Sequence, residues 1–130
     1  MYLLDSTIFL HYMQNGENTK QVEELLKRIH DGRMEGIIAY DAIITIKDNL
    51  LKANLVRQLG VFFEAITEFS NLHIYYLSMV EENYVIKVMF KFKIGYLQAL
   101  HYYIARKHNI KLISFNEAYK KIPDIKVVTP

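Results

Sequence analysis

Short apolar runs alternate with amphipathic segments along this 130-residue chain, and this alternation limits the possible folds more than any other feature. The runs are rich in Ile, Leu, Val and Tyr, which favour β-strands, and most are shorter than a typical helix. Strands that alternate with helices form a parallel sheet whose two faces are covered by helices. We therefore predict a three-layer α/β/α fold with a parallel sheet of four or five strands.

The boundaries of the elements follow from periodicity and from capping residues. We expect strands at residues 2–4, 36–40, 72–77, 110–115 and 125–128. We expect helices at residues 6–16, 19–30, 41–51, 55–69, 79–90 and 96–108, and a short helical turn at 116–121. The predicted helix caps are Ser6 or Thr7, Asp41, Ser78, Asn109 and Asn116, and a break is expected near Gly60. The length suits a single domain over residues 1–130.

Composition excludes several classes of protein and of site. Hydrophobic residues make up 52% of the chain, which is enough for a packed core and argues against disorder. The sequence has no Cys and no closely spaced pair of histidines, so a zinc site is not expected. It also has no glycine-rich phosphate loop and no nucleophile elbow. We expect a cytoplasmic protein without a membrane segment.

Charge is distributed unevenly along the chain. Residues 1–82 carry seven Lys and Arg against twelve Asp and Glu, whereas residues 83–130 carry nine against two, which gives the net charge of +2. A basic segment beside an acidic one is typical of a phosphate-binding face next to a metal-binding face. A chance accumulation of surface lysines late in the chain explains the same pattern equally well.

Polar side chains follow the carboxyl ends of the predicted strands, where open parallel sheets bind ligands. Carboxylate, amide and hydroxyl oxygens are the ligands that Mg²⁺ prefers. The residues selected in this way are Asp5, Thr7, Asp41, Asp48, Glu81, Glu82, Gln98, Ser114, Asn116 and Glu117. Most of them also have a simpler interpretation, as helix caps, first-turn helix acids or solvated polar residues. His101 and the tyrosines at 75, 76, 102 and 103 are interpreted as packing residues rather than as a general base or base-stacking surfaces.

Three segments resemble parts of the PIN domain family. MYLLDSTIFLHYM resembles the family's opening, in which an apolar strand leads to an Asp, a small polar pair and an apolar helix. QALHYYIA resembles its Asp-Ala helix, with Gln98 where the family has the acid. KLISFNEAYKKIPDIKVVTP resembles its ending, where Ser114 and Tyr119 match and Asn116 replaces an Asp. The resemblance spans the whole chain in the order and length of its elements.

The resemblance implies a metal-dependent ribonuclease similar to the VapC toxins of toxin–antitoxin pairs. In such proteins four acids hold one or two Mg or Mn ions, and metal-activated water attacks an RNA phosphodiester. Asp5 corresponds to the first acid and Asp48 to the second, with Asp41 as its competitor, so Asp5 and Asp48 would be the catalytic acids. The expected metal ligands are Asp5, Asp48, Gln98, Asn116 and Glu117, and the expected residues at the edge of the site are Thr7, Ser114 and Glu82.

Two neutral amides in place of two carboxylates weaken the attraction that holds a divalent ion against its hydration. The first hypothesis is therefore a PIN-like protein whose nuclease site has degenerated and which has kept the binding of RNA or of a partner protein. The second is an active endoribonuclease toxin in which Glu117, Glu81 or Glu82 supplies a missing acid. The third is an α/β dimerisation module without a role in nucleic-acid binding. The resemblance also implies an antitoxin-like partner. A homodimer is expected from the resemblance and from the many apolar aromatic residues, with the Tyr- and Phe-rich segment 84–103 as its surface.

Overall fold

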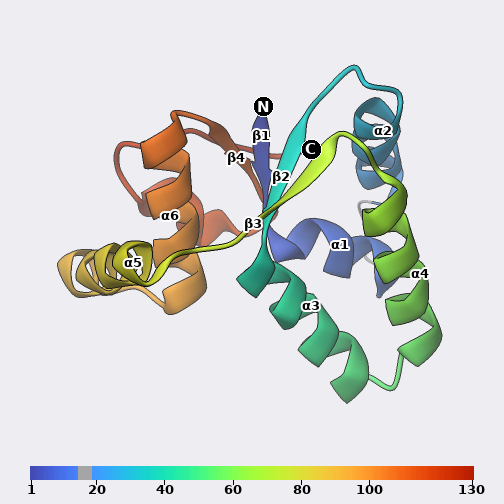
Figure 1. Ribbon diagram of the computed structural model, residues 1–130, viewed down its shortest axis with the longest axis horizontal. Coiled ribbons are helices and arrows are strands. Elements are labelled where there is room, and N and C mark those ends of the chain that lie inside the picture. The colour runs from blue at the N-terminus through green and yellow to red at the C-terminus, as the bar shows by residue number, and fades with distance from the viewer. Residues whose placement is uncertain (15–18) are drawn as a thin grey trace.

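The structure is a computed structural model that describes residues 1–14 and 19–130. The described residues form six α-helices and five strands (Figure 1). In chain order the elements are β1 (Tyr2–Leu4), α1 (Ser6–Met13), α2 (Thr19–His30), β2 (Gly36–Ala39), α3 (Tyr40–Lys52), α4 (Val56–Glu68), β3 (Leu72–Tyr75), α5 (Met79–Phe92), α6 (Tyr96–His108), β4 (Lys111–Ile113), the 3₁₀ helix η1 (Glu117–Lys121) and β5 (Val127–Val128).

All five strands form one parallel sheet in the order β3-β2-β1-β4-β5. The chain moves outward from β1 to β2 and β3, and then crosses back to place β4 on the other side of β1. The strand order therefore reverses between β1 and β4. In open parallel sheets the loops beyond such a reversal diverge and leave room for a site. Asp5 follows β1 and Ser114 follows β4, so the sequence places both residues at this point.

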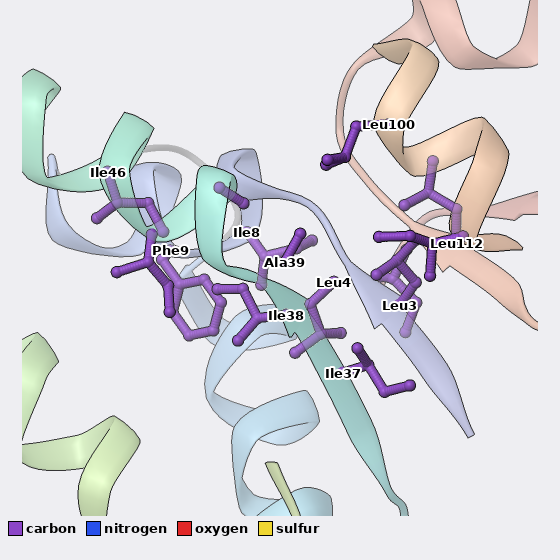
Figure 2. Close-up of a cluster of buried hydrophobic side chains, with 14 of the residues drawn as sticks. Leu3, Leu4, Ile8, Phe9, Ile37, Ile38, Ala39, Ile46, Leu100 and Leu112 are labelled. Atoms are coloured by element: carbon purple, nitrogen blue, oxygen red, sulfur yellow. The ribbon is translucent and has the colours of Figure 1, made fainter. Parts of the chain in front are cut away.

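Helices cover both faces of the sheet, as predicted (Figure 1). Helices α1, α2 and α4 lie on one side, and α5 and α6 lie on the other. Successive residues of a strand point to opposite faces. Leu3 pairs with Ile37 and Leu112, whereas Leu4 pairs with Ile38, so each strand supplies both cores. Figure 2 shows Leu3 and Leu112 beside α6, and Leu4 and Ile38 on the opposite side.

The central strands are almost completely enclosed. Leu3, Leu4, Ile38 and Leu112 have no exposed surface, and every residue of β2 is buried. Continuous burial explains why these strands are runs of apolar residues rather than alternating patterns. Among the described residues, no helix has the length and apolarity required to cross a bilayer.

Several boundaries differ from the predictions. Helix α1 has Asp5, rather than Ser6 or Thr7, at its N-cap position, and its predicted end at 15–16 lies outside the described residues. Ala39 precedes α3 in an extended conformation, so Asp41 lies in the first turn and the prediction that it caps the helix was wrong.

Two further corrections concern α4 and the strands. Helix α4 continues through Gly60, because Leu59 and Phe62 anchor it to the core on both sides of the glycine, so the predicted break was wrong. Strand β3 ends at Tyr75, which pairs with the last residue of β2, and β5 is limited to Val127–Val128. The cap predictions at Ser78, Asn109 and Asn116 are confirmed.

Candidate active site

The Asp5 carboxylate lies at the carboxyl end of the central strand and is almost completely buried, with 2% of the residue exposed. The backbone N–H of Asp5 donates to the carbonyl of Ile113 at 3.0 Å, which joins the end of β1 to the end of β4. Its side chain does not cap α1. The carboxylate is therefore free to bond with groups across the sheet edge, and a buried carboxylate requires such partners.

Two hydroxyl groups donate to the same oxygen of Asp5. The Oγ of Ser114 lies 2.6 Å from Oδ2, and the Oγ1 of Thr7 lies 2.8 Å from it. Each hydroxyl also accepts a backbone N–H, from Asn116 at 2.9 Å for Ser114 and from Phe115 at 3.1 Å for Thr7. A hydroxyl has one hydrogen to donate, so both are committed to Asp5. The network fixes the loop after β4 against the turn between β1 and α1.

The other oxygen of Asp5 faces a buried histidine. The Nδ1 of His101 lies 3.5 Å from Oδ1 of Asp5 and 2.7 Å from the hydroxyl of Tyr119. Burial lowers the pKa of His101, and the charge of Asp5 opposes this only in part. Burial also raises the pKa of Tyr119, and the nearby Asp5 carboxylate raises it further. We therefore treat His101 and Tyr119 as neutral groups at physiological pH, and His101 as an uncharged neighbour of Asp5 whose hydrogen bond is with Tyr119.

The amides predicted as metal ligands serve as helix caps. The Oδ1 of Asn116 accepts the N–H of Ala118 at 3.0 Å at the start of η1. The Oε1 of Gln98 accepts the N–H of Gly95 at 3.4 Å at the start of α6. Both oxygens are thus directed to the backbone of their own segment, which is the simpler of the two interpretations drawn from the sequence.

The two candidates for the second acid lie in different surroundings. Asp48 is exposed on α3, and its side chain has no hydrogen bond or ion pair with another described residue. Asp41 is partly buried, and burial together with the negative charge of Glu82 raises its pKa. Glu82 in turn accepts the hydroxyl of Tyr96 at 2.6 and 2.8 Å. The structure brings Asp41, Glu82 and Tyr96 together and leaves Asp48 outside this group.

The remaining acids bond with side chains of their own surroundings. Glu117 is exposed and pairs with Lys120 at 3.1 Å. Glu81 accepts the hydroxyl of Tyr75, the hydroxyl of Tyr103 at 3.1 Å and the ammonium of Lys107 at 3.2 Å. It also completes a capping box with Ser78 at the start of α5. Glu81 therefore joins β3, α5 and α6.

These residues do not form a metal site of the kind expected. In the part of the chain that the structure describes, no three His, Cys, Asp or Glu residues are grouped so that they could hold a metal ion. Both oxygens of Asp5 face protein groups, and the oxygens of Gln98 and Asn116 accept backbone N–H groups. Hard divalent cations take several oxygen ligands at one point, and the acids of this donor set are not gathered at one point in the described structure, so the set does not fit such an ion.

Comparisons with known proteins agree with the fold. A model of the PIN domain family matches residues 2–125. None of the curated proteins compared with the chain matches it. Among solved structures, VapC20 of Mycobacterium tuberculosis, a Sarcin-Ricin loop cleaving toxin, superposes with a TM-score of 0.79 at 10% identity, covering 98% of both chains.

Two further solved structures are complexes. DNA-bound VapBC from Salmonella typhimurium gives a TM-score of 0.72 at 13% identity, covering 98% of this chain and 96% of that one. A toxin–antitoxin complex from Klebsiella pneumoniae gives 0.68 at 21% identity, covering 99% and 97%. At these identities the likeness establishes the fold of the chain.

The buried network generates a first prediction. Replacing Ser114→Ala removes the 2.6 Å hydrogen bond to Asp5 and leaves the N–H of Asn116 without its acceptor. We expect the free energy of unfolding to fall by about 1–3 kcal/mol, because a buried charged group loses a donor. Urea denaturation measures this change. Ser70→Ala, at an exposed serine, is the matched control and should change stability little; equal effects of the two variants would contradict the network.

A second prediction concerns pH. Burial acts to raise the pKa of Glu81, but hydrogen bonds from Tyr75, the Ser78 backbone, Lys107 and Tyr103 outweigh it and lower the pKa to about 2. The pKa of Glu81 is lower in the folded protein than in the unfolded chain, where it is near 4.5, so the ionised carboxylate stabilises the fold above pH 4.5. This contribution is lost as the pH falls from 4.5 through about 2. Glu81→Gln should therefore destabilise the protein at neutral pH.

Denaturation experiments over a pH series measure this effect. The difference in the free energy of unfolding between the natural protein and Glu81→Gln should shrink below pH 4.5. Glu117→Gln is the control, because Glu117 forms only an exposed pair with Lys120. A loss of stability in Glu81→Gln that did not vary with pH would indicate that the carboxylate charge has no role.

Proposed function

Because the chain belongs to the PIN domain family, we propose that it derives from metal-dependent endoribonucleases, that its nuclease activity is weak or absent, and that it has kept the binding of RNA or of a partner protein. The observation that carries this proposal is the state of Asp5. The first acid of the site is buried and hydrogen-bonded to Ser114 and Thr7, and its second oxygen faces His101. A carboxylate held in this way has little capacity left for a metal ion.

Charge supports the same proposal. A divalent ion loses part of its hydration when it binds, and carboxylates compensate for that loss better than neutral amides do. Gln98 and Asn116 stand where the family resemblance places two acids, and both accept backbone N–H groups. A metal-activated nucleophile would need a denser cluster of acids than Asp5 alone supplies.

An active Mg- or Mn-dependent endoribonuclease toxin is the alternative function. It would use Asp5 with Asp48 or Asp41 and would take its missing acid from Glu82 or Glu117. The grouping of Asp41 with Glu82 is the observation that favours it, because two carboxylates near each other attract a cation. A non-catalytic α/β dimerisation module is the third possibility, and the basic segment after residue 82 argues against it.

An antitoxin-like protein is the partner that we propose. The support is the fold likeness to toxins solved together with their antitoxins. The described residues also include an apolar hollow of about 70 Å³ between α1, α2 and α4, lined by Phe9, Met13, Leu26 and Phe62 among others. A hollow of this volume admits no more than one small apolar side chain of a partner. A small reading frame for an antitoxin-like protein beside this gene would support the pairing, and its absence would count against it.

Metal binding tests the proposed function directly. Calorimetric titration of Mn²⁺ into the natural protein should give millimolar affinity or weaker, and RNA cleavage should be slow or absent. The double variant Gln98→Asp/Asn116→Asp should bind Mn²⁺ more tightly, because it restores two carboxylates. Without metal the double variant should be less stable than the natural protein, because the added carboxylates repel each other, and Mn²⁺ should restore stability.

The control for this experiment adds Asp5→Asn to the double variant. If the gain in affinity depends on the cluster around Asp5, the triple variant should lose it. Low-micromolar Mn²⁺ binding and RNA cleavage by the natural protein would overturn the proposal in favour of the active toxin. Glu82→Gln and Glu117→Gln would then identify the substitute acid.

We also propose that the protein forms a homodimer through α5. Met79, Ile86 and Phe90 are exposed, with Met79 and Phe90 each 80% exposed, and their spacing puts them on one side of the helix. A twofold interface can bury such an apolar stripe against its own copy. Light scattering should show a dimer at micromolar concentration, and Phe90→Asp should convert it to a monomer. Val56→Asp, at an exposed position of α4, should leave the dimer intact; a monomeric natural protein would refute the proposal.

A further inference from the structure

We propose that a second surface, formed by α5 and α6 and separate from the Asp5 network, binds a single strand of RNA by stacking its bases on Tyr84 and pairing its phosphates with Lys87 and Lys91. This inference rests on the proposed function, which retains RNA binding but leaves its location open. We call Tyr84, Lys87, Lys91 and Tyr103 the Tyr–Lys surface.

The aromatic part of the surface is a pair of parallel rings. Tyr84 of α5 and Tyr103 of α6 have ring centroids 6.1 Å apart and planes inclined by 12°. Tyr84 is 52% exposed, whereas Tyr103 is partly buried and donates its hydroxyl to Glu81. Tyr103 therefore has the packing role expected from the sequence, and it supports Tyr84 from behind. An exposed ring held flat by a second ring is a rigid platform for a base.

The cations of the surface are positioned around this platform. Tyr84, Lys87 and Lys91 follow one another at spacings of three and four residues, so they lie on one side of α5. The Nζ of Lys87 lies 5.2 Å from the centre of the Tyr84 ring. Both lysines are exposed, and neither has an acidic side chain within 4.0 Å among the described residues. The Nζ of Lys91 lies 5.2 Å from the centre of the Phe92 ring. Two cations without an acidic partner beside an exposed ring match the repeating phosphate and base of a single strand.

The acids nearest to this surface are already engaged. Glu81 pairs with Lys107 and accepts the hydroxyls of Tyr75 and Tyr103. Glu82 accepts the hydroxyl of Tyr96 and lies within electrostatic reach of Asp41. Lys107 therefore balances the charge of Glu81, whereas Glu82 keeps its charge but is hydrogen-bonded to Tyr96, and the two lysines give their own side of α5 a positive charge. The Lys87 ammonium now over Tyr84 can move to a phosphate, because an exposed cation–π contact is weaker than a base stacked on an aromatic ring.

The Tyr–Lys surface is distinct from the stripe proposed for the dimer. The dimer stripe and the Tyr–Lys surface are separated by about 110° around α5 on average, from the helical repeat of 100° per residue: the stripe consists of Met79, Ile86 and Phe90, and the surface on this helix of Tyr84, Lys87 and Lys91. The dimer stripe is apolar, whereas the Tyr–Lys surface combines a ring with unpaired cations. Buried protein interfaces are depleted of lysine, and single-stranded nucleic acid favours it, so the chemistry selects RNA over a protein for this side of the helix.

The test measures fluorescence anisotropy of labelled single-stranded oligouridine, whose bases stack weakly on one another, with the full-length protein. Tyr84→Ala should weaken binding about tenfold, whereas Tyr84→Phe should retain it, because the ring supplies the stack. Lys87→Glu/Lys91→Glu should weaken binding and also lower the slope of log K against log salt by about 1.4, since each phosphate contact on a single strand contributes about 0.7. Lys27→Glu/Lys52→Glu is the control, with the same change in net charge at exposed sites elsewhere.

Each outcome bears on the inference. Unchanged affinity in Tyr84→Ala and in the Lys87/Lys91 variant, while the natural protein binds oligouridine, would overturn the Tyr–Lys surface and leave the proposed function intact. No binding of oligouridine by the natural protein would overturn the inference and the RNA-binding part of the proposed function, and would leave only the binding of a partner protein. Loss of the dimer in Tyr84→Ala without loss of RNA binding would show a protein interface instead and overturn the inference. Equal binding of oligothymidine would support the stacking surface and overturn its restriction to RNA.

Discussion

A buried carboxylate must be satisfied by hydrogen bonds, and the arrangement around Asp5 follows from that requirement. Asp5 lies at the point where the strand order reverses, so its partners come from segments far apart in the sequence. The hydroxyls of Ser114 and Thr7 donate to one oxygen of Asp5. The same hydroxyls accept backbone N–H groups of the loop after β4. The same contacts that stabilise the junction of β1, α1 and β4 also occupy the group that a metal ion would need.

A second carboxylate, Glu81, organises the packing of α5 and α6 beside β3. It connects β3 to α5 and α6 through two tyrosines and a lysine, and it caps α5 together with Ser78. Val85 is the only fully buried residue of α5 in the described structure, while Val88, Met89 and Phe92 are partly buried against the core and Phe92 lies edge-to-face against Tyr102 of α6. The helix is thus anchored along one side and leaves the residues of its other sides exposed. One of these sides is apolar and another carries tyrosine and lysine, which separates two kinds of contact on a single helix.

The sequence predicted the sheet because its strands are buried on both faces and are therefore continuous apolar runs. Helix ends with a specific chemical signal, such as Ser78 and Asn109, were also predictable. The predicted break at Gly60 was wrong because a glycine disfavours a helix by only about 1 kcal/mol, and the burial of Leu59 and Phe62 offsets that cost. The approach of Asp5 to Ser114 follows from topology, but the contact of Asp5 with His101 depends on side-chain direction and burial. The only indication of this contact in the sequence was that His101 is a polar residue on the apolar face of α6. Nothing in the sequence indicated that the Tyr96 hydroxyl bonds to Glu82.

The order of the strands has a consequence for how the protein is made. β1 is the first strand to be synthesised, yet one of its two neighbours, β4, is among the last. Until residues 111–113 emerge, the central strand of the finished sheet is an edge strand, with its backbone N–H and C=O groups open on one side. During that interval the Asp5 carboxylate also lacks Ser114. A charged side chain at the end of an open edge hinders the addition of a foreign strand. Asp5 joins β1 to β4 in the finished sheet, and before β4 is added its charge hinders a foreign strand from pairing with the open edge of β1.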